Sequence, residues 1–487
     1  MSGAGHAAPP ASARRWRRAL WALALLPLLG IVTQGFLFPG RTEWPAVPRQ
    51  LHAPVILITV PGLRADRLGH LGYTLPAGRT IPVAGDPARR GTAGDPPTAE
   101  APPGTLTPTL DTLARHGVSF TGAYAVSNAS RTTAATLLSG VCPQITGVHG
   151  PDDRLPGAAR TMAEVLAARG YHCIAILGDP DLADAGLEQG FDVFITAAPG
   201  EDADGLLTAG LAAYRASTNP NVFLWIDLPD LRRPYGGRDL DLSAWAPDAP
   251  ADFGTAPELL GDLDPARLVE LGWGPRQMAW MDTRYDAALH ELDAAVGRFV
   301  AGLADDFVLE ILTLAVTGTR GERLGERAGP AFTHATDLYE GSVRVPFLLR
   351  LPARHVRSLR LERLASSEDV APTLLELGGR VTQPTQALTG CTGVSLAPDI
   401  TRLDESRDRV PFAGRHGGAD GAALVARAGT GLYKLIRSTD ADGGPRRELY
   451  LLDSDPGEWQ DIAASRPLHA DKLAEWLDTW IDDCSRP

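Results

Sequence analysis

Residues 55–73 read VILITVPGLRADRLGHLGY. The first six are aliphatic or β-branched, and this short apolar run ends at Pro61 and Gly62. Such a run, bounded by turn residues, is typical of a strand buried inside a sheet. The sequence therefore predicts a central strand at 55–60 that runs directly into a loop.

Outside this segment, short apolar runs alternate with helical patterns, which indicates an α/β fold with helices on both faces of a sheet. We expect a helix followed by a strand at 162–178, and further strands at 221–228, 310–318 and 344–352. Helices are predicted at 107–120, 133–140, 285–303 and 468–483. The Pro- and Gly-rich stretch 76–106 lacks periodicity and predicts a mobile insertion. From residue 385 the strand candidates become shorter, which indicates a small C-terminal subdomain at 385–487.

Composition limits the possible functions. The chain has 487 residues, 44% of them hydrophobic, which is enough for a large core. Its formal net charge of -13 argues against nucleic acid as a partner, because binding to phosphate backbones needs a basic face. No lysine precedes Lys434, so Schiff-base and P-loop chemistry is excluded from most of the chain.

The N-terminal region predicts a membrane anchor. Residues 19–40 carry no charge and are long enough, as a helix, to match a bilayer core. Arginines at 14, 15, 17 and 18 keep residues 1–18 in the cytoplasm by the positive-inside rule. The main domain, after a linker at 41–53, is then extracytoplasmic. A cleaved signal peptide and a buried soluble helix are the competing interpretations.

The four cysteines are far apart in sequence and show no C-x-x-C metal spacing. An extracytoplasmic location permits a disulfide, but the spacing does not identify the pair. Cys142 and Cys173, which lie in apolar surroundings, have the character of plain core residues.

Many segments, in order, resemble the sulfatase family of the alkaline-phosphatase-like superfamily. They include the opening strand, TPTLDTLARHGVSFTGAYAVSN from residue 107, TLLSGVCPQITGVHG from 136, GERLGE from 321 and LYEGSVRVPFLLRLP from 338. The resemblance spans about residues 54–465. It implies an α/β three-layer sandwich at 54–384, with a mainly parallel central sheet, and a small C-terminal α+β subdomain at 385–487. It also implies a site at the carboxyl ends of the strands.

The resemblance implies a divalent metal such as calcium, held by carboxylate and amide oxygens after two strands. The corresponding positions here are Pro61 and Gly62 after the first strand, and Thr319 and Arg320 after a later one. None of the four is a carboxylate, and Arg320 brings a positive charge to a cation site. Arg232 stands where the family has a histidine. We therefore predict that the metal site is degenerate and that no metal cofactor is bound.

The nucleophile position has two competing registers. Ser127 begins an S-x-A-x-R string that looks like a sulfatase maturation signal, whereas the spacing to the following helix end selects Ser130. Ser130 is then the candidate nucleophile at a helix N-terminus, and a plain N-cap is the alternative. His334 matches the family's leaving-group histidine, so a metal-free pair of Ser130 and His334 is a further possibility.

Other polar residues near the expected cleft have two interpretations. If Arg131, Arg232 and Arg320 all face the cleft, they form a cationic hole that binds an anion without a metal. The alternative is that each pairs with a neighbouring Asp or Glu. Three aspartates at strand ends could form a relocated site, but residues of this kind more often make turns; they are Asp179, Asp227 and Asp230.

The sequence thus predicts a membrane-anchored, extracytoplasmic sulfatase-family protein that is a non-catalytic pseudoenzyme. Its expected partners are a sulfated or phosphorylated glycan or lipid headgroup, or a partner protein. The alternative is an active sulfuric or phosphoric ester hydrolase or transferase that uses a relocated metal or the metal-free Ser130 and His334.

Overall fold

The computed structural model describes residues 53–76, 81, 105–198, 200–236, 240, 242, 245, 274–306, 308–327, 332, 337–352, 358–402, 412–414, 421–439 and 444–485. The predicted anchor at 19–40, most of the insertion at 76–106, and His334 lie outside these residues. Among the residues that are described, no helix combines the length and the hydropathy needed to cross a membrane.

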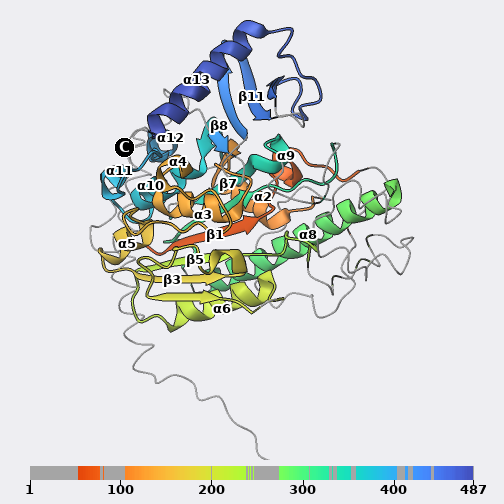
Figure 1. The fold of residues 1–487 in the computed structure, drawn as a ribbon. Helices are drawn as coiled ribbons and strands as arrows, with labels where there is room; N and C mark the ends of the chain where they lie inside the picture. The colour runs from red at the N-terminus through yellow and green to blue at the C-terminus, as the bar shows by residue number, and fades with distance from the viewer. Residues whose placement is uncertain are drawn as a thin grey trace, which may run out of the picture. The chain divides into compact units, whose positions relative to one another are not determined.

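An eight-stranded sheet forms the centre of the molecule (Figure 1). Its strands are β1 (Val55–Pro61), β2 (Val118–Tyr124), β3 (His172–Leu177), β4 (Val193–Thr196), β5 (Val222–Asp227), β6 (Thr313–Arg320), β7 (Arg344–Arg350) and β8 (Leu359–Ser366). The spatial order is β4-β3-β5-β1-β6-β7-β2-β8. β1 pairs in parallel with β5 and β6, whereas β7 is antiparallel to β6 and β2. The predicted α/β fold with a mainly parallel central sheet is confirmed.

Helices cover both faces of this sheet. On one face lie α2 (Pro108–Arg115), α6 (Ala203–Ala216) and α8 (Pro275–Asp305), and on the other lie α3 (Ser130–Ser139), α5 (Met162–Ala167) and α10 (Val370–Leu377). The other described α-helices are α4 (Pro143–Thr146), α9 (Glu340–Val343), α11 (Pro384–Ala387), α12 (Ala397–Arg402) and α13 (Pro467–Ser485), the last of which packs on the second sheet. Every residue of β1 is buried, as expected for a strand covered on both sides.

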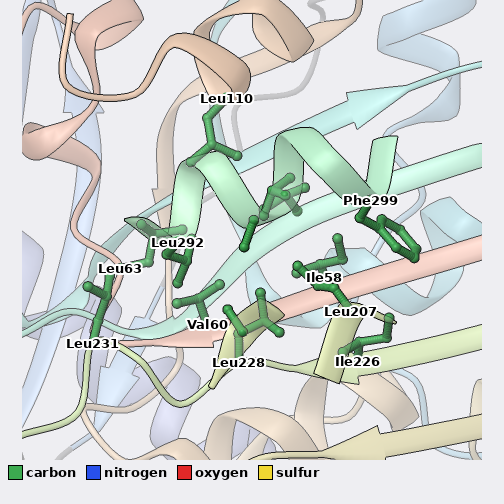
Figure 2. Close-up of a cluster of buried hydrophobic side chains, with 14 of the residues drawn as sticks. Ile58, Val60, Leu63, Leu110, Leu207, Ile226, Leu228, Leu231, Leu292 and Phe299 are labelled. Atoms are coloured by element: carbon green, nitrogen blue, oxygen red, sulfur yellow. The ribbon is translucent and has the colours of Figure 1, made fainter. Parts of the chain in front are cut away.

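Alternate residues of β1 serve two different cores. Ile58 and Val60 pack with Leu292 and Phe299 of α8 and Leu207 of α6 (Figure 2). Val55 and Leu57 point the other way, into a core that α3, α5 and α10 complete. Because a fully buried Leu, Ile or Phe contributes roughly 1.5–3 kcal/mol, these two cores fix β1 and hence the place where it ends.

A second, antiparallel sheet follows in the C-terminal segment. It contains β9 (Phe412–Gly414), β10 (Gly421–Ala428), β11 (Gly431–Thr439) and β12 (Pro445–Leu451) in the order β12-β11-β10-β9. One face packs on β2 and β8 of the central sheet through Tyr124 and Leu364. The other face packs against Leu473 and Leu477 of α13, drawn in blue in Figure 1. The predicted small C-terminal α+β unit is therefore present.

A buried ion cluster joins the second sheet to the main body. Lys434 of β11 is fully buried, and its Nζ lies 3.0 Å from a carboxylate oxygen of Glu340 in α9 and 3.0 Å from one of Glu458. Burial raises the pKa of Glu458 to about 7, although the charge of Lys434 opposes this. A lysine in such surroundings needs both carboxylates, because an unpaired buried charge is strongly unfavourable.

One predicted element was partly wrong. The segment 107–120 was expected to be a single helix, but α2 ends at Arg115 and β2 begins at Val118. Gly117 lies between them, and the Cβ of any other residue there would come 2.2 Å from the carbonyl oxygen of Leu349. The periodic pattern of the helix therefore hid a close chain crossing at Gly117 and the start of a strand.

Candidate functional site

The carboxyl ends of β1 and β6 meet at the edge of the central sheet. Pro61 is the register partner of Arg320 across the parallel pair, and the backbone N–H of Gly62 donates to the carbonyl oxygen of Arg320 at 3.1 Å. The four positions implied for metal ligands are therefore adjacent in space, as the sequence predicted. What they offer is a proline ring, a glycine, a hydroxyl and a guanidinium.

The position of Gly62 is closed to any side chain. Its φ of +90° is a conformation that residues other than glycine rarely adopt. A Cβ atom built there would lie 2.5 Å from the carbonyl oxygen of Leu231. A carboxylate at residue 62 is therefore incompatible with this backbone, so the second ligand position is lost in shape as well as in chemistry.

Arg320 is buried and paired within the chain. It is 1% exposed, and its Nη1 donates to the carbonyl oxygen of Gly321 at 2.9 Å and forms an ion pair with Glu322. The other oxygen of the Glu322 carboxylate accepts a hydrogen bond from the Tyr235 hydroxyl at 2.9 Å. We call the four implied ligand positions the former cage. Beside it, the Glu322 carboxylate is thus engaged by the guanidinium of Arg320 and by the hydroxyl of Tyr235.

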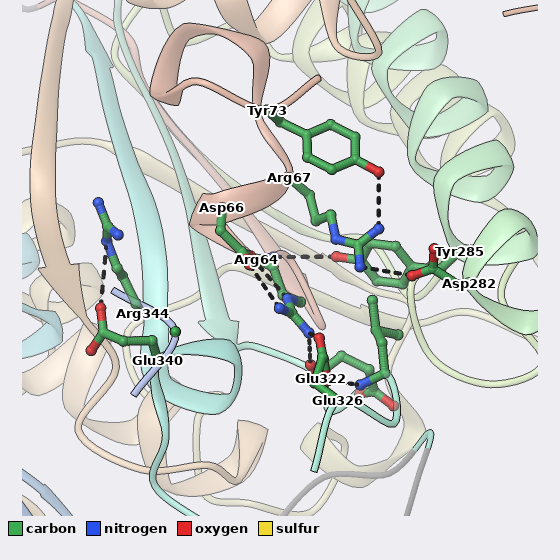
Figure 3. A network of polar contacts seen from close by, with 12 residues as sticks. Arg64, Asp66, Arg67, Tyr73, Asp282, Tyr285, Glu322, Glu326, Glu340 and Arg344 are labelled. Carbon is green, nitrogen blue, oxygen red and sulfur yellow. Dashed lines mark hydrogen bonds and ion pairs between the residues drawn. The ribbon is translucent and has the colours of Figure 1, made fainter. Parts of the chain in front are cut away.

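A second arginine, Arg64, connects the loop after β1 to the residues that follow β6 (Figure 3). Arg64 donates to the backbone oxygen of Glu322 at 2.9 Å and pairs with Asp66 at 2.7 Å. The hydroxyl of Tyr285 donates to the Gly62 carbonyl at 2.7 Å and accepts from the Arg64 N–H at 3.3 Å. Burial alone would raise the pKa of Asp66, but the charge and hydrogen bond of Arg64 outweigh it and hold that pKa well below its usual value. The loop after β1 is therefore held in place by the chain's own charges.

The next arginine of this loop anchors it to α8. Arg67 forms ion pairs with Asp282 at 2.7 Å and with Asp286 at 3.0 Å, and its Nη1 donates to the Tyr73 hydroxyl at 3.0 Å. Figure 3 shows Arg67, Tyr73 and Asp282 beside the Arg64 group. These contacts hold Arg67 and Tyr73, and with them this part of the loop, against α8.

Ser130 lies at the same sheet edge. It is the first residue of α3, and its hydroxyl accepts a hydrogen bond from the Thr319 hydroxyl at 3.1 Å. Ala129 occupies the N-cap position and no side chain caps the helix, so Ser130 is not the cap residue. Ser127 lies before the helix, where its hydroxyl accepts from the Ala129 N–H at 3.2 Å. The register that selects Ser130 thus brings it into contact with one of the implied ligand positions.

The three arginines predicted to bind an anion are each ion-paired. The pairs are Arg131 with Asp184, Arg232 with Asp179 and Asp181, and Arg320 with Glu322. This is the alternative that the sequence had left open for them. Arg131 pairs with Asp184 and Arg232 pairs with Asp181, and the side chains of these two aspartates are 71% and 62% exposed. Because exposed ion pairs are weak, another anion can compete for these two arginines.

Of the aspartates at strand ends, Asp179 and Asp227 are buried and Asp230 is partly buried, and the pKa of all three is raised. Burial, followed by the neighbouring charge of Asp179, raises the pKa of Asp227 to about 7, and burial also raises the pKa of Asp179. One oxygen of Asp227 accepts from the Thr59 hydroxyl at 2.7 Å, while the other has no hydrogen-bond partner. Asp230 accepts from the Ala203 N–H at 3.1 Å, and burial raises its pKa to about 6.

These residues do not fit a divalent metal. Hard cations such as calcium take six to eight oxygen ligands, several of them carboxylates. In the part of the chain that the structure describes, no three His, Cys, Asp or Glu side chains come together in a way that would hold a metal ion. The implied positions offer Pro61, the sterically closed Gly62 and the positively charged Arg320. The side chains at these positions therefore do not form a set of oxygen ligands for such an ion.

Comparisons with known proteins agree with this architecture. A family model described as Sulfatase matches residues 252–380. Human arylsulfatase A is 30% identical over 320 residues, which cover 57% of this chain and 60% of that protein. The ulvan-active sulfatase of Formosa agariphila is 25% identical over 362 residues, covering 67% and 66%. The chain spans about three fifths of the length of the arylsulfatase A relatives that it matches.

Solved structures resemble it over most of its length. A 2-O GAG sulfatase has a TM-score of 0.61 at 19% identity, covering 89% of this chain and 93% of that one. A phosphonate monoester hydrolase of Agrobacterium radiobacter has a TM-score of 0.61 at 17% identity, covering 89% and 96%. The fold, with the candidate site at the carboxyl ends of β1 and β6, thus defines an alkaline-phosphatase-like α/β protein. Within that class, the chain is similar in sequence and in fold to members of the sulfatase family.

Sequence reasoning missed the residues that fill the former cage. Glu322 stands two positions after Arg320 in the GERLGE segment, and this spacing was a usable signal for a local ion pair. Tyr235 and Tyr285 come from distant segments, and nothing in their local sequence indicates where their hydroxyls lie.

Proposed function

We propose that this chain is a sulfatase-family pseudoenzyme that does not hydrolyse sulfate or phosphate esters through a bound metal, and that it binds an anionic group instead. The observation that carries the proposal is that the former cage is occupied by the chain itself. Gly62 lies against the Leu231 carbonyl, and Arg320 is buried in an ion pair with Glu322. Attack on an ester anion needs a cation at the reacting centre and an activated nucleophile.

The surroundings of Ser130 support the same conclusion. Its hydrogen bond comes from Thr319, a second hydroxyl, which is far too weak a base to take up the serine proton near neutral pH. His334, the base of the metal-free alternative, lies outside the described residues. That alternative remains an outcome of the experiment below.

The start of α3 supports anion binding. Its first N–H groups have no side-chain cap, and the helix dipole favours negative charge there. Beside them, the buried Nε of Arg131 has no hydrogen-bond partner. A sulfated or phosphorylated glycan or lipid headgroup carries the oxyanion that such donors bind. Because related proteins are named as an ulvan-active sulfatase and a 2-O GAG sulfatase, a sulfated glycosaminoglycan is the first probe to use.

We also propose that residues 19–40 anchor the protein in a membrane, with the main domain extracytoplasmic. The uncharged apolar run and the four arginines before it support this topology. Resistance of the full chain to carbonate extraction, together with protease access to the main domain from outside intact cells, tests it. Release of the chain by carbonate would contradict the anchor.

The decisive test of the pseudoenzyme is turnover. The purified full chain is dialysed against calcium, magnesium, manganese and zinc, and its metal content is measured by elemental mass spectrometry. It is then assayed with 4-nitrophenyl sulfate and 4-nitrophenyl phosphate, beside Ser130→Ala and the matched control Ser127→Ala. We expect no stoichiometric metal and no turnover above the level of Ser130→Ala.

Turnover that Ser130→Ala abolishes and Ser127→Ala retains would establish an enzyme and overturn the proposal. Anion binding is measured separately, as the rise in unfolding temperature with added inorganic sulfate or a sulfated glycosaminoglycan. Arg131→Gln should reduce this rise, whereas Arg215→Gln should leave it unchanged, because it removes only an exposed pair between Arg215 of α6 and Asp306 at the end of α8. An equal rise in all three chains would place the anion elsewhere, and the absence of any rise would turn the search to a partner protein.

A further inference from the structure

Two cysteines that are distant in sequence touch in the folded chain. The Sγ of Cys142 lies 3.3 Å from the Sγ of Cys484, although the residues are 342 positions apart. Cys142 directly precedes α4, whereas Cys484 lies in the last turn of α13. Both are buried, with exposed fractions of 0% and 9%. Their contact joins the end of the chain to the helical layer that carries α3.

Both sulfurs are held by ordered structure. The backbone N–H of Cys142 donates to the Thr392 hydroxyl at 2.8 Å, and Pro143 begins α4 immediately afterwards. α13 is packed on the second sheet through Leu473 and Leu477, and it contacts α4. The encounter of the two sulfurs therefore follows from packing on both sides of the contact.

From this geometry we infer that Cys142 and Cys484 form a disulfide that fastens α13 to the main domain. A disulfide needs the sulfurs at about 2.05 Å, so they must approach by about 1 Å, which small side-chain rotations provide. The inference concerns a modification site and does not depend on the proposed anion binding.

The other two cysteines lie in different surroundings. Cys173 is a buried residue of β3, and its Sγ lies near the carbonyl oxygens of Ala163 and Tyr171. Cys391 has its Sγ 3.5 Å from the carbonyl oxygen of Gly393 and lies beside Gly140. Gly140 is only two residues before Cys142, so Cys391 is the competitor that an experiment has to distinguish.

The bond forms by exchange with an external disulfide, such as oxidised glutathione. The Cys484 thiolate attacks that disulfide, giving a mixed disulfide and releasing one thiolate, which takes up a proton. The Cys142 sulfur, as it loses its proton, then displaces the second thiolate from the mixed disulfide. Two protein thiols are oxidised to one disulfide, and one external disulfide is reduced to two thiols.

Cys484 is the residue that reacts first. It is 9% exposed, whereas Cys142 is 0% exposed, so a reagent in solution reaches Cys484 more easily. Cys142 is less reactive, because its contact with Cys484, followed by burial, raises the pKa of its thiol above the usual value. Once formed, the bond closes a loop of several hundred residues and restricts the unfolded chain.

The test uses the full chain, reduced and then equilibrated in a glutathione buffer that contains the oxidised form. After an acid quench and denaturation, free thiols are alkylated with N-ethylmaleimide and the intact mass is measured. Of the four cysteines, we expect two to escape alkylation, with a linked peptide that joins Cys142 to Cys484. The unfolding temperature of the oxidised chain should exceed that of the reduced chain.

Two variants make the assignment specific. Cys484→Ser should lose the oxidation-dependent rise in unfolding temperature, whereas Cys173→Ser should keep it. Alkylation of all four cysteines in the equilibrated wild-type chain would refute the inference, and so would a peptide that links Cys142 to Cys391. The mass measurement on the wild-type chain is decisive even if a variant folds poorly.

Discussion

Gly62 lies directly against the carbonyl oxygen of Leu231, so closely that a Cβ atom at residue 62 would come within 2.5 Å of that oxygen. One chain crossing therefore decides whether the loop after β1 can carry a metal ligand. The Leu231 segment also carries Arg232 and Tyr235, so the same crossing brings in residues that now pair around the former cage.

The first prediction uses this contact. Gly62→Ala should lower the free energy of unfolding by about 2 kcal/mol more than Gly72→Ala, because the added methyl group meets backbone that cannot move freely. Gly72 is a matched control, since it has φ +103° and no atom within 4 Å of a Cβ built there. Urea unfolding measures both. Equal costs would mean that the loop shifts to admit a side chain, and the second ligand position would then be open.

The ion pair of Arg320 and Glu322 gives the second prediction. Arg320→Met should cost about 3–5 kcal/mol of stability, because it leaves the Glu322 carboxylate buried without its cation. The double variant Arg320→Met with Glu322→Met should recover much of that loss. Arg298→Met, which removes an exposed pair with Asp204, should change stability by no more than about 1 kcal/mol. A small loss in the Arg320 variant would argue that the guanidinium does not hold the cage closed.

Asp227 gives a pH prediction. Its pKa is about 7 in the folded chain against a reference value of 3.8, so between these values the folded state binds a proton that the unfolded state lacks. The stability contributed by this proton falls as the pH rises from about 4 to about 7, by at most about 1.4 kcal/mol per pH unit. Asp227→Asn, which keeps an acceptor for Thr59, should remove that part of the slope.

The measurement is urea unfolding at several pH values between 4 and 8. Asp305→Asn, at an exposed position at the end of α8, is the matched substitution measured beside it. A slope that persists unaltered in Asp227→Asn would assign the titration to other buried carboxyl groups such as Asp293, whose pKa burial raises to about 7.

The fourth prediction concerns the joint between the two sheets. Lys434→Met should lower the free energy of unfolding by about 3–5 kcal/mol, because Glu340 and Glu458 would face each other without the cation that both contact. Lys472→Met, at an exposed position on α13, should have little effect. A small loss at Lys434 would mean that these carboxyl groups take up protons easily and that the cation is dispensable.

The sequence predicted those features that depend on neighbours along the chain. β1, β3, β5 and β6 each have the continuous apolar pattern of a strand buried on both faces, and the adjacency of Pro61 and Arg320 followed from parallel strands ending at the same edge. Counting along a single helix selected Ser130, which is the first residue of α3, and its role stays a prediction. Each of these inferences needed only local spacing.

The sequence could not predict contacts that depend on the exact path of the chain. The pairing of Arg131 with Asp184, the approach of Leu231 to Gly62 and the meeting of Cys142 with Cys484 join segments with no mutual pattern. β2 was missed because the apolar residues of α2 continue into it across Gly117. In each case the contact depends on side chains or backbone from separate elements, and the hydrophobic periodicity of one segment does not predict such contacts.

The burial of Lys434 also makes this protein unusually simple to label. The chain has only Lys434 and Lys472, and the first is enclosed as a cation between two carboxylates. Besides the α-amino group at the start of the chain, which reacts at lower pH, amine-reactive dyes and crosslinkers applied to the folded protein therefore have one lysine to modify, the exposed Lys472 of α13. A single fluorophore placed there would report the docking of the final helix without any engineered handle.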